Sequence, residues 1–456
     1  MLFTAVTMPY RRAILTLAAC ALITSVVAVD PALQERYGKP SLYATFEGQR
    51  VVTYAGVPNN DTLATEIANG ALMNQTLASL LPGDILVIPN NTYHVMGGIS
   101  STGLVNVTIS FEGTLVYSKS MKAWPRSTPG SKGKVLPCMK FEQATNLRLV
   151  GVEGGSLFDG NGAVWWGFPG IGYLLIGENR PQLLVVDHCT NVLVENVILK
   201  NSPYYSFLGT SAQGMEIRDS SVNARRDNDD GHDILDLTAF NTDGFDVTGR
   251  DVWIHDVTVW NQDDCVAVKD NSQNMLIERV NASGLGMTIG SIGGSLVRNI
   301  TFRDIVMPHT FKGIYMKFRS SGVIEDVLYE NITMYDVEQY PIWIGPAQQS
   351  DSSDLCAAHP CSLCWPLLAP YAQCNCPEQA FYRNITLRNI QVLGSKNSPG
   401  VIMANSSCPM TNIVFDNVVV QDAGDKPFGT NYKCEGVASG IATGGTNPVP
   451  SCFQQV

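Results

Sequence analysis

The chain is poor in charge, and poorest in positive charge. Its 456 residues include 41 Asp and Glu against 30 Lys and Arg, and charged residues make up 16% of the total. Without residues 1–28, which hold two arginines and no acid, the balance is 28 bases to 41 acids, a net charge of −13. Lysine and arginine contacts dominate the binding of nucleic acid, so this composition excludes nucleic acid as an expected partner.

Long apolar runs are also missing. Only residues 13–27 form an extended apolar stretch, and it is short for a helix of about 20 residues that crosses a membrane. Two arginines precede it and Val26-x-Ala28 offers small residues for cleavage, so residues 1–28 are predicted to be a signal peptide. We therefore expect a secreted, extracellular protein with no membrane association after cleavage; an uncleaved anchor is the alternative.

N-glycosylation sequons are frequent, as in secreted glycoproteins. The N-x-S/T asparagines are Asn60, Asn74, Asn90, Asn106, Asn281, Asn299, Asn331, Asn384 and Asn405. Some match by chance, because the sequence Asn-Ile-Thr is also typical of strands.

The sequence also lacks linkers and crossover helices. No Pro-, Gly- or Ser-rich tract divides the chain, so residues 29–456 are predicted to form one domain. Without helices between the strand-like segments, an α/β barrel or a doubly wound sheet is excluded. The best helix candidate, 61–81 with Asn60 or Asp61 as N-cap, is expected to cover the open edge of the first strands at 85–89 and 105–117.

A repeat is present instead. Three turns recur between Asn241 and Gly294 at intervals of roughly 20–25 residues. They are an acidic turn at Asp243, an acidic pair at Asp263 and Asp264, and a glycine turn at 284–286, and short β-branched runs lie beside each. This period is too short for a propeller blade, and the internal similarity is too strong for a sandwich. We predict an all-β fold, a right-handed single-stranded parallel β-helix with an N-terminal capping helix.

Eight cysteines crowd the last quarter of the chain. In a secreted protein an even local set indicates disulfides, whose pairing the sequence leaves open. A zinc site is the alternative for the four cysteines between Cys361 and Cys376. At least one of Cys138, Cys189 and Cys265 is expected to be a buried free thiol.

Two segments interrupt the period: 224–240 and a cysteine-rich insertion at about 347–379. On a solenoid, such insertions project as loops from one face. In the acidic run 227–233, His232 occupies the position where an EF-hand loop requires glycine, so a solvated loop is favoured over a calcium site.

The acidic turns predict a site. Successive rungs lie about 4.8 Å apart, which brings Asp243, Asp263, Asp264 and position 285 onto one patch of surface. Clustered carboxylates raise at least one pKa, and a protonated acid beside an ionised one suits glycoside hydrolysis. Aspartates that only satisfy turn amides are the alternative, and spacing alone does not separate the two.

Four sequence blocks carry a resemblance: NTDGFDV (241–247), QDDCVAVK (262–269), GLGMTIGSIGG (284–294) and GIYMKF (313–318). In this order they resemble the motifs of the polygalacturonase family, glycoside hydrolase family 28. GSLFDGNGAVWW (155–166), ENRPQLLVV (178–186) and LKNSPYYSF (199–207) are similar to upstream parts of that family. The likeness covers nearly the whole mature chain apart from the two insertions.

The resemblance implies an inverting hydrolase that cleaves α-glycosidic bonds of a pectic polysaccharide. Asp263 would be the general acid, and Asp243 and Asp264 would hold and activate a water molecule. Lys317 matches a lysine that contacts a sugar carboxylate, and Asn241 and Gly286 lie in the matching blocks as candidate substrate-binding residues. We expect a monomer without a cofactor or metal ion.

Two departures bear on the substrate. Leu285 stands where the family has histidine, and Tyr315 stands where it has arginine, the natural bidentate partner of a uronate carboxylate. Their loss favours a mixed or less charged pectic chain over unmodified polygalacturonate. Tyr315 could stack on a sugar ring, and His309 could replace the missing histidine.

Two other classes of function remain open. A polysaccharide lyase would require an arginine base and usually calcium, and the acidic blocks contain no such arginine. A catalytically inactive, glycan-binding β-helix fits the two departures, but it does not explain why all three aspartates are retained.

Overall fold

The computed structural model describes residues 49–128, 133–152, 156–167, 179–226, 239–351, 354 and 356–456. All of them belong to one compact unit, Gly48–Val456. The predicted signal peptide and the acidic run 227–233 lie outside the described residues.

Short strands dominate the described chain. The first half contains β1 (Val51–Thr53), β2 (Ile85–Ile88), β3 (Thr92–Val95), β4 (Ile99–Thr102), β5 (Thr108–Phe111), β6 (Thr114–Tyr117), β7 (Met139–Glu142), β8 (Thr145–Gly151), β9 (Leu157–Asp159), β10 (Leu184–Asp187), β11 (Thr190–Glu195), β12 (Ile198–Lys200), β13 (Phe207–Arg218) and β14 (Ser221–Ala224). The second half contains β15 (Phe245–Asn261), β16 (Val266–Ser283), β17 (Met287–Ile292), β18 (Ser295–Pro308), β19 (Ile314–Phe318), β20 (Gly322–Val337), β21 (Ile342–Pro346), β22 (Gln348–Gln349), β23 (Cys361–Ser362), β24 (Ala380–Ser395), β25 (Gly400–Met403), β26 (Thr411–Ala423), β27 (Tyr432–Glu435), β28 (Gly440–Thr443) and β29 (Gln454–Gln455). The helical elements are α2 (Leu63–Ala78) and the 3-10 turn η1 (Gly162–Val164).

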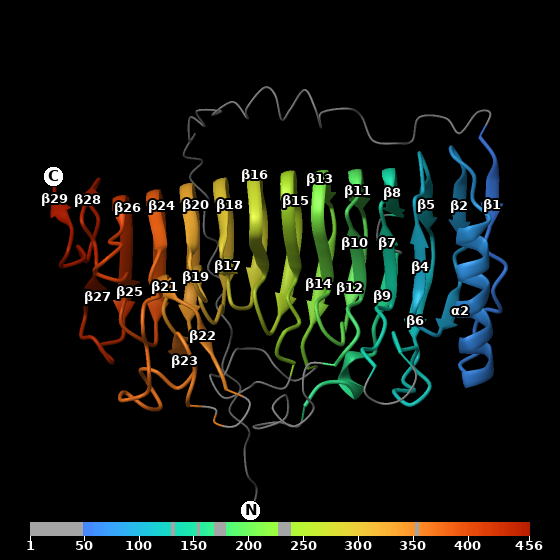
Figure 1. The fold of residues 1–456 in the computed structure, drawn as a ribbon, viewed down its shortest axis with the longest axis horizontal. Helices are drawn as coiled ribbons and strands as arrows, with labels where there is room; N and C mark the ends of the chain where they lie inside the picture. The colour runs from blue at the N-terminus through green and yellow to red at the C-terminus, as the bar shows by residue number, and fades with distance from the viewer. Residues whose placement is uncertain are drawn as a thin grey trace, which may run out of the picture. The chain divides into compact units, whose positions relative to one another are not determined.

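The strands of successive rungs pair in parallel, as predicted. One column runs from Phe207 through Phe245, Val266 and Met287 to Ile314, each residue opposite the next. Figure 1 shows the rungs in chain order, from β1 at the blue end to β29 at the red end. The fold is a right-handed parallel β-helix, the hand that parallel crossovers almost always take.

Each rung buries one side of its strands and turns at polar residues. In β20 the side chains of Ile324, Val327 and Tyr329 are buried in the interior of the β-helix. Asp326 and Asn331, in the same strand, adopt positive φ angles of 56° and 55°. Asn and Asp tolerate this left-handed conformation better than other non-glycine residues, so the polar breaks between the apolar pieces become the corners of the rungs.

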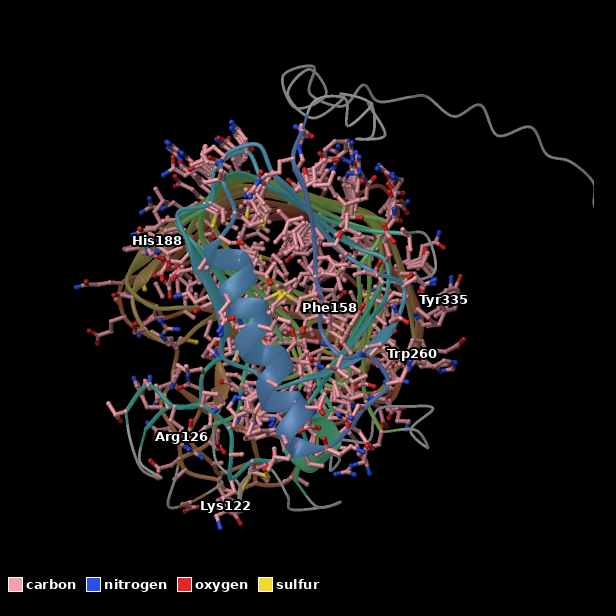
Figure 2. The ribbon with its side chains drawn as sticks, turned by 90° about the vertical axis from the view of Figure 1, so that its right-hand side faces the viewer. Lys122, Arg126, Phe158, His188, Trp260 and Tyr335 are labelled. Atoms are coloured by element: carbon pink, nitrogen blue, oxygen red, sulfur yellow. A yellow bond between two sulfur atoms is a disulfide. The ribbon has the colours of Figure 1, made fainter. Side chains whose placement is uncertain are left out.

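Helix α2 covers one end of the solenoid, next to β3 and β4. Figure 2 looks at this end, with α2 across the front and Phe158 inside the stack. The predicted N-cap at Asn60 or Asp61 is wrong: Thr62 caps the helix, and its hydroxyl accepts a hydrogen bond from the Thr65 N–H. Strand β1, which the sequence did not predict, precedes this helix. No helix in the described residues is long and apolar enough to cross a membrane.

The cysteine-rich insertion is held by disulfides. Cys356 pairs with Cys364, and Cys361 pairs with Cys374, so the zinc alternative is wrong. A third bridge joins Cys434 to Cys452 near the C-terminal end of the solenoid. Four free thiols of the described chain are buried: Cys138, Cys189 and Cys265, as expected for at least one of these three, and Cys408. Cys376 is also free, so two of the eight cysteines expected to form disulfides are unpaired.

Candidate active site

The three predicted aspartates meet at one edge of the stack. Asp243 comes just before β15, and Asp263 and Asp264 come just before β16, so adjacent rungs present them at the same end of neighbouring strands. Each offers a carboxylate oxygen, and these oxygens all lie within 4.8 Å of one another. Leu285 in the next rung lies directly beside this group, because its N–H donates to the main-chain oxygen of Asp263 over 2.7 Å. The three carboxylates therefore meet as predicted, although they are buried and do not lie on an exposed patch of surface.

Two lysines neutralise part of this acidic cluster. Lys317 Nζ lies 2.9 Å from Asp264 Oδ2. Lys269 Nζ lies 3.3 Å from Asp243 Oδ2, 3.1 Å from Asp246 Oδ2 and 3.8 Å from Asp264 Oδ2. Paired in this way, four buried carboxylates can share a small volume.

Asp246 and Lys269 were missed by the sequence reasoning. Both lie in apolar strands, β15 and β16, and Asp246 is fully buried. The available signal was a charged residue within the apolar run that begins each strand, because buried charges are normally paired with one another.

The neighbouring carboxylates Asp263 and Asp264 have opposite protonation tendencies. Burial raises the pKa of Asp263, and repulsion from Asp243 and Asp264 raises it further. Burial alone would also raise the pKa of Asp264, but Lys317, Lys269 and the Thr288 hydroxyl together lower it below its ordinary value. The arrangement therefore favours a protonated Asp263 beside an ionised Asp264.

The pKa of Asp243 is raised, like that of Asp263. Burial and the neighbouring Asp246 raise its pKa, against the opposing effect of Lys269. Burial also raises the pKa of Asp246, to about 6. Asp243 Oδ1 is buried and accepts no hydrogen bond from the described residues, as is also true of the carboxylate oxygens of Asp246, so it has room for a new hydrogen-bond partner.

Asn241 and Gly286 support the aspartates through the backbone. Asn241, at a φ of 57°, donates its main-chain N–H to Asp263 Oδ2 over 3.0 Å. Gly286 has a φ of 87°, and a Cβ there would lie 2.0 Å from the Gly313 oxygen. The Gly286 oxygen accepts from the N–H of Cys265, which follows the acidic pair. Only glycine fits this close contact between rungs.

Tyr315 is not open to stack on a sugar. It is 2% exposed and packs in a second apolar cluster with Tyr340, Trp343, Val401, Met403 and Cys361, with Leu285 at its margin. The Nζ atoms of Lys312 and Lys317 each lie 4.1 Å from the centroid of its ring. The two departures from the family motifs, Leu285 and Tyr315, thus belong to one apolar cluster beside the carboxylates.

The structure does not bring His309 to the carboxylates. Its side chain is 54% exposed, and Nδ1 lies 3.4 Å from Asp336 Oδ2. Its main-chain oxygen accepts from the hydroxyl of Ser283. His309 therefore does not replace the histidine missing at position 285.

The three carboxylates are also the one group in the described chain whose ligand atoms could hold a metal ion together. Lys269 and Lys317 already supply positive charge at this place. The expectation that no metal is needed remains a prediction.

Comparison with known proteins places these residues inside a recognised sequence pattern. The family model of glycosyl hydrolases family 28 matches residues 84–361. A probable endopolygalacturonase C from Aspergillus aculeatus is 33% identical over 207 residues, which cover 44% of this chain and 51% of that protein. A polygalacturonase from Penicillium griseoroseum is 27% identical over 281 residues, 60% of this chain and 67% of that protein. The match spans about half the length of the first of these relatives.

Solved structures share the fold. An exopolygalacturonase from Thermotoga maritima superposes with a TM-score of 0.60 at 16% identity, covering 82% of this chain and 87% of that one. An endo-xylogalacturonan hydrolase from Aspergillus tubingensis gives a TM-score of 0.63 at 18% identity, covering 89% and 99%. At these identities the likeness establishes the β-helix alone.

Proposed function

Because the chain belongs to family 28 of the glycosyl hydrolases, we propose that it hydrolyses α-glycosidic bonds of a pectic polysaccharide. Relatives named polygalacturonase point to a galacturonate-containing chain as the substrate class. The observation that carries the proposal is the pair of adjacent carboxylates with opposite pKa shifts, Asp263 raised and Asp264 lowered.

The roles follow from these charge states. Protonated Asp263 donates its proton to the leaving glycosidic oxygen, and the Asn241 N–H holds the carboxyl in place. Ionised Asp264 takes the proton of the attacking water, while Oδ1 of Asp243, which has no hydrogen-bond partner in the described chain, orients that water. Lys317 keeps Asp264 ionised and, in the proposal, also contacts a sugar carboxylate.

Inversion of the anomeric centre is part of the proposal and rests on the family. The oxygens of the cluster lie within 4.8 Å, closer than the separation of roughly 6.5–9.5 Å that is usual between the acid and base of inverting enzymes. That rule concerns two carboxylates on opposite faces of the sugar, whereas here Asp243 and Asp264 would share one water beside the acid. NMR of the first product tests this step: the opposite anomer supports inversion, and the retained anomer contradicts it.

Hydrolysis itself is tested with the wild type and Asp263→Asn on polygalacturonate and rhamnogalacturonan. We expect new reducing ends without new ultraviolet absorbance, and a loss of at least about a hundredfold in kcat for the variant. The matched control is Asp304→Asn, at an exposed corner with a φ of 56°, where asparagine keeps the oxygen that accepts from Asn331. It should retain wild-type activity.

Other outcomes identify the competing functions. New absorbance from unsaturated products would indicate a lyase. The buried arginine beside these rungs, Arg225, donates to the main-chain oxygens of Asn261 and Ser283, which gives the lyase alternative no added support. Binding without cleavage of any pectic polymer would indicate a glycan-binding protein.

Secretion and a monomeric state complete the proposal. Secretion rests on the predicted signal peptide, the sequons and the disulfides of the described chain. The monomer and the lack of a nucleic-acid partner remain predictions from composition.

A further inference from the structure

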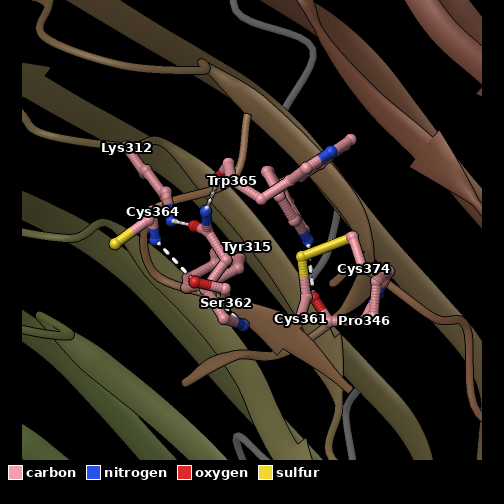
Figure 3. Close-up of a disulfide and its surroundings, with 10 residues drawn as sticks. Lys312, Tyr315, Pro346, Cys361, Ser362, Cys364, Trp365 and Cys374 are labelled. Carbon is pink, nitrogen blue, oxygen red and sulfur yellow. Dashed lines mark hydrogen bonds between the residues drawn. A yellow bond between two sulfur atoms is a disulfide. The ribbon is translucent and has the colours of Figure 1, made fainter. Parts of the chain in front are cut away.

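Lys312 is a buried lysine beside the candidate active site. It lies just before β19 and is 3% exposed. Its Nζ donates to Gln348 Oε1 over 2.6 Å, and it lies 4.1 Å from the ring centroid of Tyr315 and 5.1 Å from a ring of Trp343. Figure 3 shows Lys312 reaching toward Tyr315 at the edge of the disulfide-bonded insertion.

The charge of Lys312 is not balanced. In the described chain no carboxylate lies within 4.0 Å of its Nζ, whereas Lys317 and Lys269 each contact aspartates. Gln348 and two aromatic rings are neutral partners, and a buried ammonium group without a counter-ion is costly. Burial and repulsion from Lys317 accordingly lower the pKa of Lys312 to about 7.

Its position points to an anionic group of the substrate. Lys312 and Lys317 lie at equal distances, 4.1 Å, from the centroid of the Tyr315 ring. Asp263 and Asp264 raise the pKa of Lys312, so the lysine is within electrostatic reach of the reacting carboxylates. Among the lysines of the site in the described chain, Lys312 is the one without a carboxylate partner, whereas Lys317 and Lys269 both contact Asp264.

We propose that Lys312 is a specificity-determining residue that binds the carboxylate of a uronate ring next to the cleaved bond. Gln348 holds the ammonium group in the free protein, and the sugar carboxylate becomes its charged partner in the complex. Tyr315 stands where the family has arginine and carries no positive charge. Lys312, which lies outside the block 313–318, then supplies the second cation beside Lys317. The substrate at this position is a free uronate rather than a neutral or esterified sugar. This inference rests on the proposed function.

The test measures binding in an inactive background. Asp263→Asn and Asp263→Asn/Lys312→Met are titrated by calorimetry with a galacturonate trisaccharide and with its carboxyl-reduced form. We expect Lys312→Met to weaken binding of the acidic trisaccharide by roughly 10- to 100-fold, the effect of one charge-assisted hydrogen bond, and to leave the reduced form unchanged. Lys312→Arg should retain most of the affinity. Lys396→Met, at a lysine 71% exposed and paired with Glu338, is the matched control and should change neither.

A pH series gives a readout that packing alone would not produce. A bound carboxylate favours the protonated amine, so affinity for the acidic trisaccharide should fall above about pH 7 with Lys312 and stay level with Lys312→Arg. The other ionisable groups near Lys312 are Lys317, Tyr315 and Asp264, since residue 263 is asparagine in this background. Because Asp263→Asn/Lys312→Met lacks the amine, its pH series reports the contribution of these other groups.

Several results overturn the inference. Equal losses for both trisaccharides would mean that Lys312 supports packing only, and no loss would mean that it does not contact the substrate. If the wild type cleaves polygalacturonate and Lys312→Met does so equally well at low substrate concentration, this inference fails alone. If the wild type neither cleaves nor binds any galacturonate chain, the proposed function fails, and the inference with it.

Discussion

Lys317 and Asp264 form a buried ion pair in which Nζ lies 2.9 Å from one carboxylate oxygen and 3.2 Å from the other. The lysine comes from β19 and the aspartate from the turn before β16, and the two are 53 positions apart in the sequence. This contact makes Asp264 differ from Asp263, its neighbour in sequence. The pKa of one carboxyl of the acidic pair is therefore lowered while the pKa of the other is raised.

The ion pair predicts a shift in the pH dependence of activity. Lys317→Met removes the cation that most lowers the pKa of Asp264, so this pKa should rise. The proposed base must be ionised, and the acid limb of kcat/KM should therefore move to higher pH, by about one unit. The pH profile on a pectic substrate measures this, with Lys396→Met as the control. An unmoved limb would mean that Asp264 is not the base.

The burial of Lys312 predicts that replacing this lysine by methionine stabilises the folded protein. Its pKa is lowered to about 7 in the folded protein, so between that pH and the ordinary lysine pKa the unfolded chain binds one proton more. Stability therefore rises with pH in that window, and the cost of burying the charge is largest below it. Lys312→Met should raise the Tm by about 2–5 °C below pH 7, and the gain should shrink at higher pH. Thermal unfolding of the free protein at a series of pH values checks this; a lower Tm at every pH would contradict it.

Replacing Gly286 by alanine is predicted to cause a steric clash between rungs, and the cost of this clash can be measured apart from the cost of backbone strain. Gly286→Ala places a Cβ 2.0 Å from the Gly313 oxygen at a φ of 87°. The comparison is Gly294→Ala, with a φ of 99° and nothing within 4 Å of the new Cβ. The control should lose about 1–2 kcal/mol of unfolding free energy from strain, and Gly286→Ala at least about twice that. Denaturant unfolding measures both, and equal losses would show that the rungs move apart at no cost.

The sequons predict an uneven pattern of glycosylation, given secretion. Each side-chain amide of Asn299, Asn331 and Asn384 donates to the preceding rung over 3.0 Å. A glycan on that nitrogen would come between stacked side chains. Asn90 and Asn281 are exposed and make no side-chain hydrogen bond within the described chain. Glycopeptide mass spectrometry of secreted protein should find glycans at these two asparagines and little at the other three; full occupancy at the three would contradict the prediction.

Sequence alone was sufficient for the repeat and the acidic patch. Short β-branched pieces and polar corners recur at one period, and stacking then brings Asp243, Asp263 and Asp264 together whatever the details of the loops. The helix at the N-terminal end was also predictable, although its cap was not, since Asn60, Asp61 and Thr62 are all good capping residues and only the chain's path selects among them.

Contacts between distant segments required the tertiary structure. Lys312 lies outside the sequence blocks, and Asp246 and Lys269 lie inside them without an assigned role, because the effect of each depends on which rungs lie beside it and on how little water reaches it. The division of the acidic pair into a protonated and an ionised member likewise depends on Lys317 from another rung. The sequence by itself determined which carboxylates meet, since the solenoid repeat places them, while the tertiary structure decided their charges, since burial and ion pairing act through space rather than along the chain.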